Sequence, residues 1–270
     1  MALSDLQRQV LRLLADRRIA ERERYVAGGV ALGELLGSPR LSRDIDLFHD
    51  TERAVAESWE ADRRRLGEAG YDVEVVRERP GYVEARVGRG DAIVLLEWAR
   101  DSAFRFFPLV EHELLGLALH PFDLATNKVL ALIGRLEPRD WFDVLWADEH
   151  LQPLGYLAWA AAGKDPGFGP TGILAAASRN GRYVPAELEG LDFAGAPPDA
   201  AALGRRWHEA LELAGEIVRR LPVESVGQCV LTLGGELFTG EIAELDRAIA
   251  GGELRFHAGS IGGALPALKS

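Results

Sequence analysis

The stretch 25–48 reads YVAGGVALGELLGSPRLSRDIDLF and holds the clearest structural pattern in the chain. The apolar run 25–27 meets two glycines, and the residues 30–36 that follow have helical character. Gly, Ser and Pro at 37–39 are a turn signal, and the alternating polar and apolar residues 44–48 are typical of a strand with one solvated face. The stretch therefore predicts a strand, a helix and a second strand.

Segments on both sides of this stretch extend the pattern. Upstream, apolar residues recur at helical spacing over 3–14, which predicts an amphipathic helix. Downstream, 51–69 returns to helical spacing, and three alternating segments separated by glycine-containing turns follow at 71–76, 82–87 and 92–98. The first part of the chain thus predicts an α/β fold around a mixed sheet.

The pattern becomes helical from residue 111 onward. Helices are expected over 110–118, 122–134, 139–150, 153–162, 170–178, 199–220, 223–233 and 240–250. Loops rich in glycine and proline separate several of them. The sequence therefore predicts an α/β (α+β) protein with an N-terminal domain over 1–118 and a helical C-terminal domain over 119–270.

The composition argues against several classes of protein. The chain has 31 Lys and Arg against 42 Asp and Glu, a formal net charge of −11, which opposes sequence-blind coating of nucleic acid. Its single cysteine, Cys229, cannot form an internal disulfide, and there is no CxxC pair for structural zinc. No apolar run approaches the roughly 18 residues of a membrane helix, and no signal-peptide pattern opens the chain. A cytoplasmic protein is expected.

Two carboxylates and two glycines carry the strongest chemical signal. On a strand, Asp44 and Asp46 project from the same face, where they repel each other unless a cation lies between them. Ligation by oxygen atoms of this kind suits Mg²⁺. Gly28 and Gly29, between a strand and the start of a helix, present backbone N–H groups of the kind that bind phosphates. The pattern predicts a metal site beside a phosphate site.

A two-metal phosphoryl-transfer site needs a third carboxylate from a neighbouring strand. Glu97 ends the apolar run 92–96 and is the first candidate. Asp101, just beyond that strand, is the competing one. The choice between them stays open at the level of the sequence.

A second polar cluster follows the expected strands. Lys128 and Arg135 are seven residues apart and share one helix face, while Asp140 and Asp143 share another. A purely structural interpretation pairs Arg135 with Asp140 and Arg139 with Asp143. Because the chain has 28 Arg and only three Lys, a lysine at 128 favours a site for a compact charge, such as one that meets a triphosphate.

The remaining candidates are weaker. The six histidines show no metal-ligand spacing, and Ser42 lacks the partners of a hydrolase triad. The arginine runs 17–24 and 63–65 predict solvated faces, or, if they flank an active site, a guide for an RNA end. Three tryptophans at helical positions are expected in the core: Trp141, Trp146 and Trp159.

These motifs resemble a known enzyme family. The Gly28-Gly29 pair followed by Ser42-Arg43-Asp44-Ile45-Asp46 looks like the Gly-Gly/Ser…Asp-x-Asp signature of the nucleotidyltransferase superfamily. The later segment 123–143, with its Asp-Leu, Asn-Lys, Arg and Arg-Asp…Asp elements, resembles the AbiEii/AbiGii branch, the toxins of AbiE-type toxin–antitoxin systems. The resemblance covers about 25–50 and 90–145 and implies a nucleotidyltransferase fold followed by a helical domain.

The resemblance also implies a role for each matching residue. The phosphate-binding residues would be Gly28, Gly29 and Ser42, and the Mg²⁺ ligands Asp44, Asp46 and Glu97. Lys128 would neutralise the triphosphate, and Asp140 would be the acidic residue of the family's fourth motif, both supplied by the C-terminal domain. The third carboxylate is usually Asp in the wider superfamily, so Glu97 is a departure from the pattern.

The function that follows from the resemblance is Mg²⁺-dependent transfer of NMP from an NTP to an acceptor hydroxyl. The acceptor implied by the family is the 3′ end of tRNA, with a cognate antitoxin that restrains the toxin. Two alternatives are a transferase that modifies a small molecule of the aminoglycoside type and a degenerate binding module without catalysis. The sequence does not identify the NTP.

Overall fold

The computed structural model describes residues 3–22, 24–179 and 185–266. The chain divides into two compact units. The first consists of Met1–Ala103 and Leu109–His120, and the second of Phe104–Pro108 and Pro121–Ser270.

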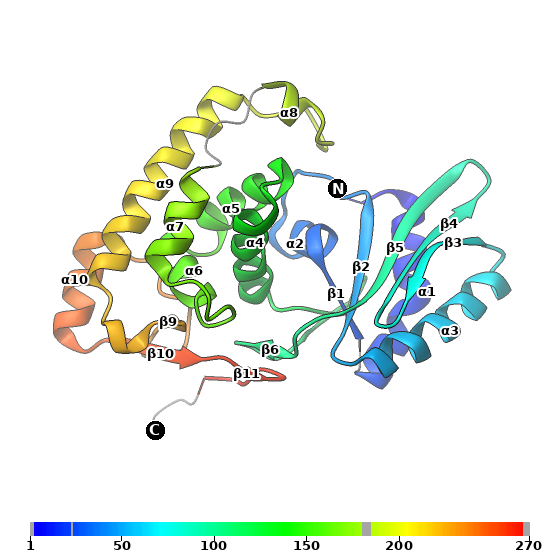
Figure 1. The fold of residues 1–270 in the computed structure, drawn as a ribbon, viewed down its shortest axis with the longest axis horizontal. Coiled ribbons are helices and arrows are strands. Elements are labelled where there is room, and N and C mark those ends of the chain that lie inside the picture. Colours follow the sequence, from blue (N-terminus) through cyan, green and yellow to red (C-terminus); the bar gives the residue numbers. More distant parts are fainter. Residues whose placement is uncertain (1–2, 23, 180–184, 267–270) are drawn as a thin grey trace. The chain divides into compact units, whose positions relative to one another are not determined.

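The first unit is a seven-stranded sheet with helices on both faces (Figure 1). Its elements are α1 (Asp5–Glu21), β1 (Arg24–Ala27), α2 (Gly28–Leu36), β2 (Asp44–His49), α3 (Glu52–Glu68), β3 (Asp72–Arg79), β4 (Tyr82–Arg89), β5 (Ala92–Arg100), β7 (Val110–His112) and β8 (Gly116–Ala118). The strand order is β3-β4-β5-β2-β1-β8-β7, with β2–β5 and β1–β8 parallel and the other pairs antiparallel. The expected mixed α/β sheet is confirmed.

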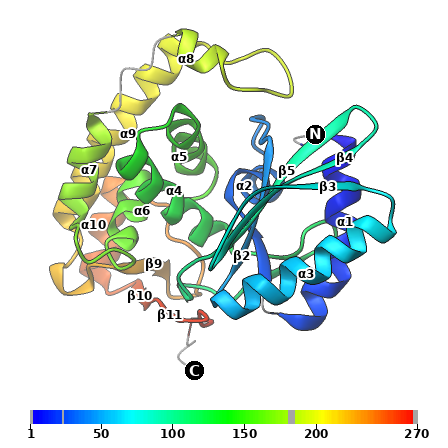
Figure 2. The same cartoon turned by 45° about the vertical axis from the view of Figure 1, so that its right-hand side comes forward.

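The alternation within β2 sorts its side chains between the two faces. Helices α1 and α3 lie on one face of the sheet and α2 on the other (Figure 2). Ile45 and Leu47 are fully buried, and Leu47 is opposite Trp98 of β5, which packs on Trp59 of α3, so both point to the α3 side. Asp44 and Asp46 are half-buried on the opposite face, where the Asp46 carboxylate lies against Gly28 of α2. Because side chains alternate along a strand, burying the aliphatic residues fixes where the carboxylates go.

A buried ion pair lies between the sheet and α3. Arg24 Nη1 donates to Asp62 Oδ1 at 2.6 Å, with both side chains fully buried, and Trp98 Nε1 donates to the second carboxylate oxygen at 2.9 Å. Arg18 is also fully buried and donates to backbone carbonyls of α1 and of the segment before β8. The expectation of a solvated face over 17–24 is therefore wrong for Arg18 and Arg24, because hydrogen-bonded acceptors compensate their burial.

The segment 110–118 forms strands β7 and β8 rather than the expected helix. β8 is parallel to β1, with Val26 opposite Ala118. Gly116 at its start has a φ of 71°, and a Cβ on it would lie 2.7 Å from the carbonyl oxygen of Ala15 in α1. The periodicity of the short apolar run 114–119 does not distinguish helix from strand, so the pairing of β8 with β1 decides.

The second unit is mostly helical. Its elements are β6 (Phe104–Arg105), α4 (Pro121–Arg135), α5 (Pro138–His150), α6 (Leu154–Ala161), α7 (Pro170–Ser178), α8 (Pro185–Glu189), α9 (Ala200–Arg220), the 3₁₀ turn η1 (Val223–Ser225), β9 (Gln228–Thr232), α10 (Ile242–Gly251), β10 (Leu254–Ala258) and β11 (Ser260–Ile261). Two small antiparallel sheets form, β9 with β10 and β6 with β11. No helix in the described part of the chain is both long and apolar enough to cross a membrane.

The core of the second unit joins α6, α9, α10 and the antiparallel pair β9 and β10, which are connected in the chain through α10. Buried residues from these elements pack together: Tyr156, Trp159, Ile217, Leu221, Val230 and Leu245. The polar ends of the aromatic residues are satisfied, since Tyr156 Oη donates to Gly240 O at 2.8 Å and Trp159 Nε1 to Ser225 O at 2.9 Å. Trp141 and Trp159 are buried as expected, whereas Trp146 is half-buried and stacks on His150.

The expected helix over 223–233 is wrong. This segment forms the short turn η1 and the strand β9, which pairs with β10. Cys229, Val230 and Leu231 are all fully buried, so the strand shows no polar and apolar alternation. A strand buried on both faces reads as a continuous apolar run, which resembles a buried helix in sequence.

A carboxylate fixes residues 104–108 to the second unit. Asp123 Oδ1 accepts from the backbone N–H of Phe106 at 2.9 Å, and Oδ2 accepts from that of Phe107 at 3.0 Å. Lys164 Nζ lies 2.8 Å from Asp123 Oδ1 and donates to Asn127 Oδ1 at 2.7 Å. Asp123 is fully buried, and these contacts compensate the cost of burying its charge.

Candidate active site

The acidic candidates of the first unit meet on neighbouring strands. In the parallel pairing of β2 with β5, Asp46 is opposite Glu97, and Asp44 is opposite Leu95. Asp46 and Glu97 thus occupy adjacent positions on one sheet face. Asp101 lies beyond the end of β5, where its N–H donates to His49 O at 2.9 Å. The strand register brings Glu97, rather than Asp101, next to Asp46.

Glu97 lies in a row of carboxylates. In the antiparallel pairing of β4 with β5 it is opposite Glu84, so acidic residues flank it on both sides. Burial raises the pKa of Glu97, and Asp46, Asp44 and Glu84 raise it further, while a hydrogen bond with Tyr82 opposes them. A cation bound among these carboxylates would relieve their mutual repulsion.

The sequence did not single out Glu84 or Tyr82 as neighbours of the site. Both lie on β4 two residues apart, and their register against β5 places them on the side of Glu97. Burial and the nearby Glu97 and Glu84 raise the pKa of Tyr82 to about 12, so its hydroxyl stays protonated as a donor at neutral pH. The alternation of side chains along β4 indicates that Tyr82 and Glu84 share one face of the strand. Only the pairing of β4 with β5 shows that this face is next to Glu97.

The donor chemistry fits a hard divalent cation. Asp44, Asp46 and Glu97 all offer carboxylate oxygens, the ligand type that Mg²⁺ prefers. Within residues 3–22, 24–179 and 185–266, no three His, Cys, Asp or Glu side chains already stand close enough together to hold a metal ion. The three carboxylates are therefore brought to one face without forming a closed cage.

Gly28 connects the acidic face to the start of α2. It has a φ of 62°, in the left-handed region that favours glycine. A Cβ on this residue would overlap the Asp46 carboxylate, with Oδ2 as the nearest atom. Asp46 therefore lies directly against the first residue of α2, and the glycine-rich turn and the carboxylate pair form one continuous surface.

Ser42 is held beside the same turn. Its carbonyl accepts from Gln7 Nε2 at 2.7 Å, and Gln7 itself is fixed by a capping box with Ser4 at the start of α1. Ser42 Oγ donates to the carbonyl oxygen of Asp44 at 3.4 Å. The candidate phosphate-binding hydroxyl is thus positioned by the first helix of the chain.

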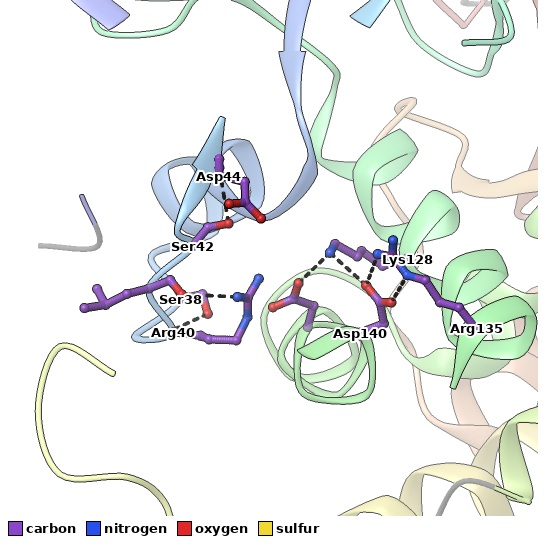
Figure 3. Close-up of polar contacts among 9 residues, drawn as sticks. Ser38, Arg40, Ser42, Asp44, Lys128, Arg135 and Asp140 are labelled. Atoms are coloured by element: carbon purple, nitrogen blue, oxygen red, sulfur yellow. Dashed lines mark hydrogen bonds and ion pairs between the residues drawn. The ribbon is translucent and has the colours of Figure 1, made fainter. Parts of the chain in front are cut away.

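Lys128 and Asp140 lie in the second unit, where they contact each other. Lys128 Nζ is 2.9 Å from Asp140 Oδ1 and 2.8 Å from Asp143 Oδ2, and its side chain is only 8% exposed. Arg135 Nε donates to Asp140 Oδ2 at 2.6 Å and Nη2 to Asp140 Oδ1 at 2.9 Å (Figure 3). The expected bridge between Arg135 and Asp140 is present, and it shares its carboxylate with Lys128.

The cations determine the charge state of Asp140. Burial would raise the pKa of Asp140, but hydrogen bonds from Arg135 and Lys128, together with their charges, outweigh burial and lower it. Asp140 is therefore ionised at neutral pH. The cluster of Lys128, Arg135, Asp140 and Asp143 contains two cations and two anions held between α4 and α5.

Comparison with known protein families gives a match across more than half of the chain. The family model described as the nucleotidyl transferase AbiEii toxin of type IV toxin–antitoxin systems matches residues 12–164. This range includes every candidate residue from Gly28 to Asp140. No curated protein matches the sequence.

Solved structures share the fold at low sequence identity. A candidate nucleotidyltransferase from H. pylori aligns over 82% of this chain and 99% of its own, with 15% identity and a TM-score of 0.52. MenT4, a nucleotidyltransferase toxin of Mycobacterium tuberculosis, aligns over 81% of this chain and 85% of its own, with 14% identity and a TM-score of 0.52. The chain belongs to the AbiEii family and is a nucleotidyltransferase, of a type that implies an NTP substrate, a divalent metal ion and a cognate antitoxin.

Proposed function

We propose that the protein transfers NMP from an NTP to an acceptor hydroxyl with Mg²⁺ as the metal, acting as the toxin of a toxin–antitoxin system. The observation that carries this proposal is the contact between Asp46 and Gly28. It joins a set of carboxylates to a glycine-rich helix start, and phosphoryl transfer needs a metal site and a phosphate site side by side.

In this proposal the metal ligands are Asp44, Asp46 and Glu97. Mg²⁺ bound there would neutralise charge on the phosphates and lower the pKa of the acceptor hydroxyl. Carboxylates that repel one another in the free protein, as the raised pKa of Glu97 indicates, gain from a shared cation. The strand pairing of Asp46 with Glu97 supports this assignment over one that uses Asp101.

The phosphate ligands in this proposal are the amides of Gly28 and Gly29 and the hydroxyl of Ser42. The acceptor oxygen forms a bond to the α-phosphorus, the bond from that phosphorus to the bridging oxygen breaks, and pyrophosphate leaves. The proton of the acceptor hydroxyl passes to an ionised carboxylate of the site. Phosphates suit a helix N-terminus because its amide N–H groups have no partner within the helix.

The second unit contributes Lys128 and Asp140 in this proposal. Lys128 provides the charge that meets the triphosphate, and Asp140 keeps the ammonium group in place. Two carboxylates already contact Lys128, so a triphosphate would share this cation rather than find it unengaged. The proposed division of labour follows the expected domains, 1–118 for the metal and 119–270 for this ion-pair cluster.

The proposed acceptor is the 3′ end of tRNA, in keeping with the resemblance of the segment 123–143 to AbiEii toxins. A terminal ribose offers a free hydroxyl that needs no unwinding of a duplex. NTPs and tRNA are cytoplasmic, and we expect the enzyme to act in that compartment. A cognate antitoxin would restrain it.

A label-transfer screen tests the proposal. The protein is incubated with Mg²⁺ and each α-labelled NTP in turn, in the presence of total tRNA or of aminoglycosides. Label on tRNA supports the proposal, and label on the aminoglycosides alone would replace it with a small-molecule transferase. Calorimetry with NTP and Mg²⁺ addresses the remaining alternative, because absence of binding indicates a non-catalytic module.

The matched variants are Asp44→Asn with Asp46→Asn, and Asp72→Asn as a control. Asp72 is an exposed residue of β3 in the same unit, so the control also removes acidic charge from the sheet. We expect the double variant to lose transfer and the control to keep it. Transfer that persists in the double variant would overturn the metal-site assignment.

A further inference from the structure

Arg40 is a buried arginine in the loop between α2 and β2. Arg40 is only 5% exposed. Its backbone N–H donates to Ser38 Oγ at 3.4 Å, and its Nη1 donates to the carbonyl oxygen of Leu41 at 3.2 Å (Figure 3). The side chain is therefore folded back onto its own loop instead of extending into solvent, which fixes where the guanidinium lies.

The guanidinium lies beside Gly29. A Cβ built on Gly29 would be 2.5 Å from Arg40 Nη2 and 2.8 Å from Ser42 Oγ. Both polar groups thus fill the space that Gly29 leaves next to the first turn of α2. Gln7 of α1 holds the Ser42 backbone from the other side. One guanidinium and one hydroxyl are fixed at the amide end of this helix.

The charge of Arg40 is of the same sign as the helix end beside it. The N-terminus of a helix carries partial positive charge, and acidic residues there are stabilising. α2 has no acidic residue in its first turn and no side-chain cap. An arginine beside this end adds to the positive potential, and its planar donors match pairs of phosphate oxygens. A phosphate at this helix end would be attracted both by the amide N–H groups of α2 and by the guanidinium.

We propose that Arg40 binds the triphosphate of the NTP and stabilises the departing pyrophosphate. Asp46 lies against Gly28, and Arg40 against the next residue, Gly29, which places Arg40 one step from the carboxylates along the phosphate chain. When the bond from the α-phosphorus breaks, its electron pair stays on the bridging oxygen of pyrophosphate. The guanidinium meets that added charge and transfers no proton.

This inference rests on the proposed function, but its test does not need catalysis. Binding of inorganic tripolyphosphate and of NTP to the full chain is measured by calorimetry for the wild type, Arg40→Gln and Arg40→Lys. A charge-assisted hydrogen bond of this kind predicts that Arg40→Gln raises the Kd for tripolyphosphate about 10- to 100-fold. Arg40→Lys keeps the positive charge but loses the paired N–H donors of the guanidinium. We expect its Kd to lie between those of the wild type and Arg40→Gln.

The control is Arg64→Gln, since Arg64 is an exposed arginine of α3 in the same unit. It should bind tripolyphosphate as the wild type does. Equal Kd values for the wild type and Arg40→Gln would overturn the inference, and if Arg40→Gln does not fold, Arg40→Lys decides in the same way. A wild type that binds tripolyphosphate through Arg40 and yet transfers no label would refute the proposed function alone.

Discussion

Acidification should destabilise the first unit through His49. This residue ends β2, is fully buried and faces Arg24 across the β1–β2 pairing. Burial and then the charge of Arg24 lower the pKa of His49 from 6.5 to about 4. The folded protein thus keeps the imidazole neutral at pH values where the unfolded chain protonates it.

The sign and size of the effect follow from linkage. Because the folded pKa of His49 lies below the unfolded one, its contribution to stability is full above pH 6.5 and is lost as the pH falls toward 4. Each pKa unit corresponds to about 1.4 kcal/mol, so the full loss in the free energy of unfolding is about 3 kcal/mol. Most of that loss is complete by pH 4.5.

Urea unfolding at pH 7.5 and pH 4.5 measures this loss. Many carboxylates titrate in the same range, so the useful quantity is a comparison with His49→Gln, whose side chain does not protonate. We expect the wild type to lose about 2.5 kcal/mol more than the variant between the two pH values. An equal loss in both proteins would refute the reasoning, because it would show that His49 is not held neutral.

Three further predictions concern single substitutions. Asp62→Asn removes the ionic contact between Asp62 and the buried Arg24 and should lower the free energy of unfolding by about 3–5 kcal/mol, measured by urea denaturation. Lys128→Met and Lys164→Met each break a buried ion pair in the second unit, so both should lower the melting temperature. Only Lys128→Met should abolish label transfer. Equal transfer activity in the two variants would argue against a role for Lys128 in catalysis. Gly28→Ala strains a left-handed position and displaces the acidic group behind it, so transfer should fall about 100-fold while calorimetric NTP binding falls less.

The sequence predicts the strands β2, β4 and β5 of the first unit well because their apolar and polar residues alternate. The alternation of Ile45 and Leu47 with Asp44 and Asp46 contains both the strand and the orientation of its carboxylates. The alternation does not indicate which strand pairs with β2. The position of Glu97 opposite Asp46 depends on a parallel pairing between residues about fifty positions apart, and no local pattern contains it.

Prediction from sequence fails where burial is complete on all sides. Cys229 to Leu231 form a fully buried strand, and β8 lies between β1 and β7 within the buried run 114–119, so both segments are continuous apolar runs in the sequence. Arg18 and Arg24 show the converse, because a charged residue looks exposed until its acceptors, one of them Asp62, are known. The sequence does not indicate a role for Arg40 either, because the guanidinium lies beside Gly29, eleven residues earlier, only in the folded chain.

The hold that Asp123 has on the backbone of Phe106 and Phe107 has a consequence for dissecting the protein. Because 104–108 belong to the second unit and 109–120 return to the first, the chain passes between the units three times. A fragment that ends at 103 loses β8, the neighbour of β1 in the sheet, while one that ends at 120 carries two amides cut off from their carboxylate. No single cut yields both units whole, so each is best studied by substitution within the intact chain.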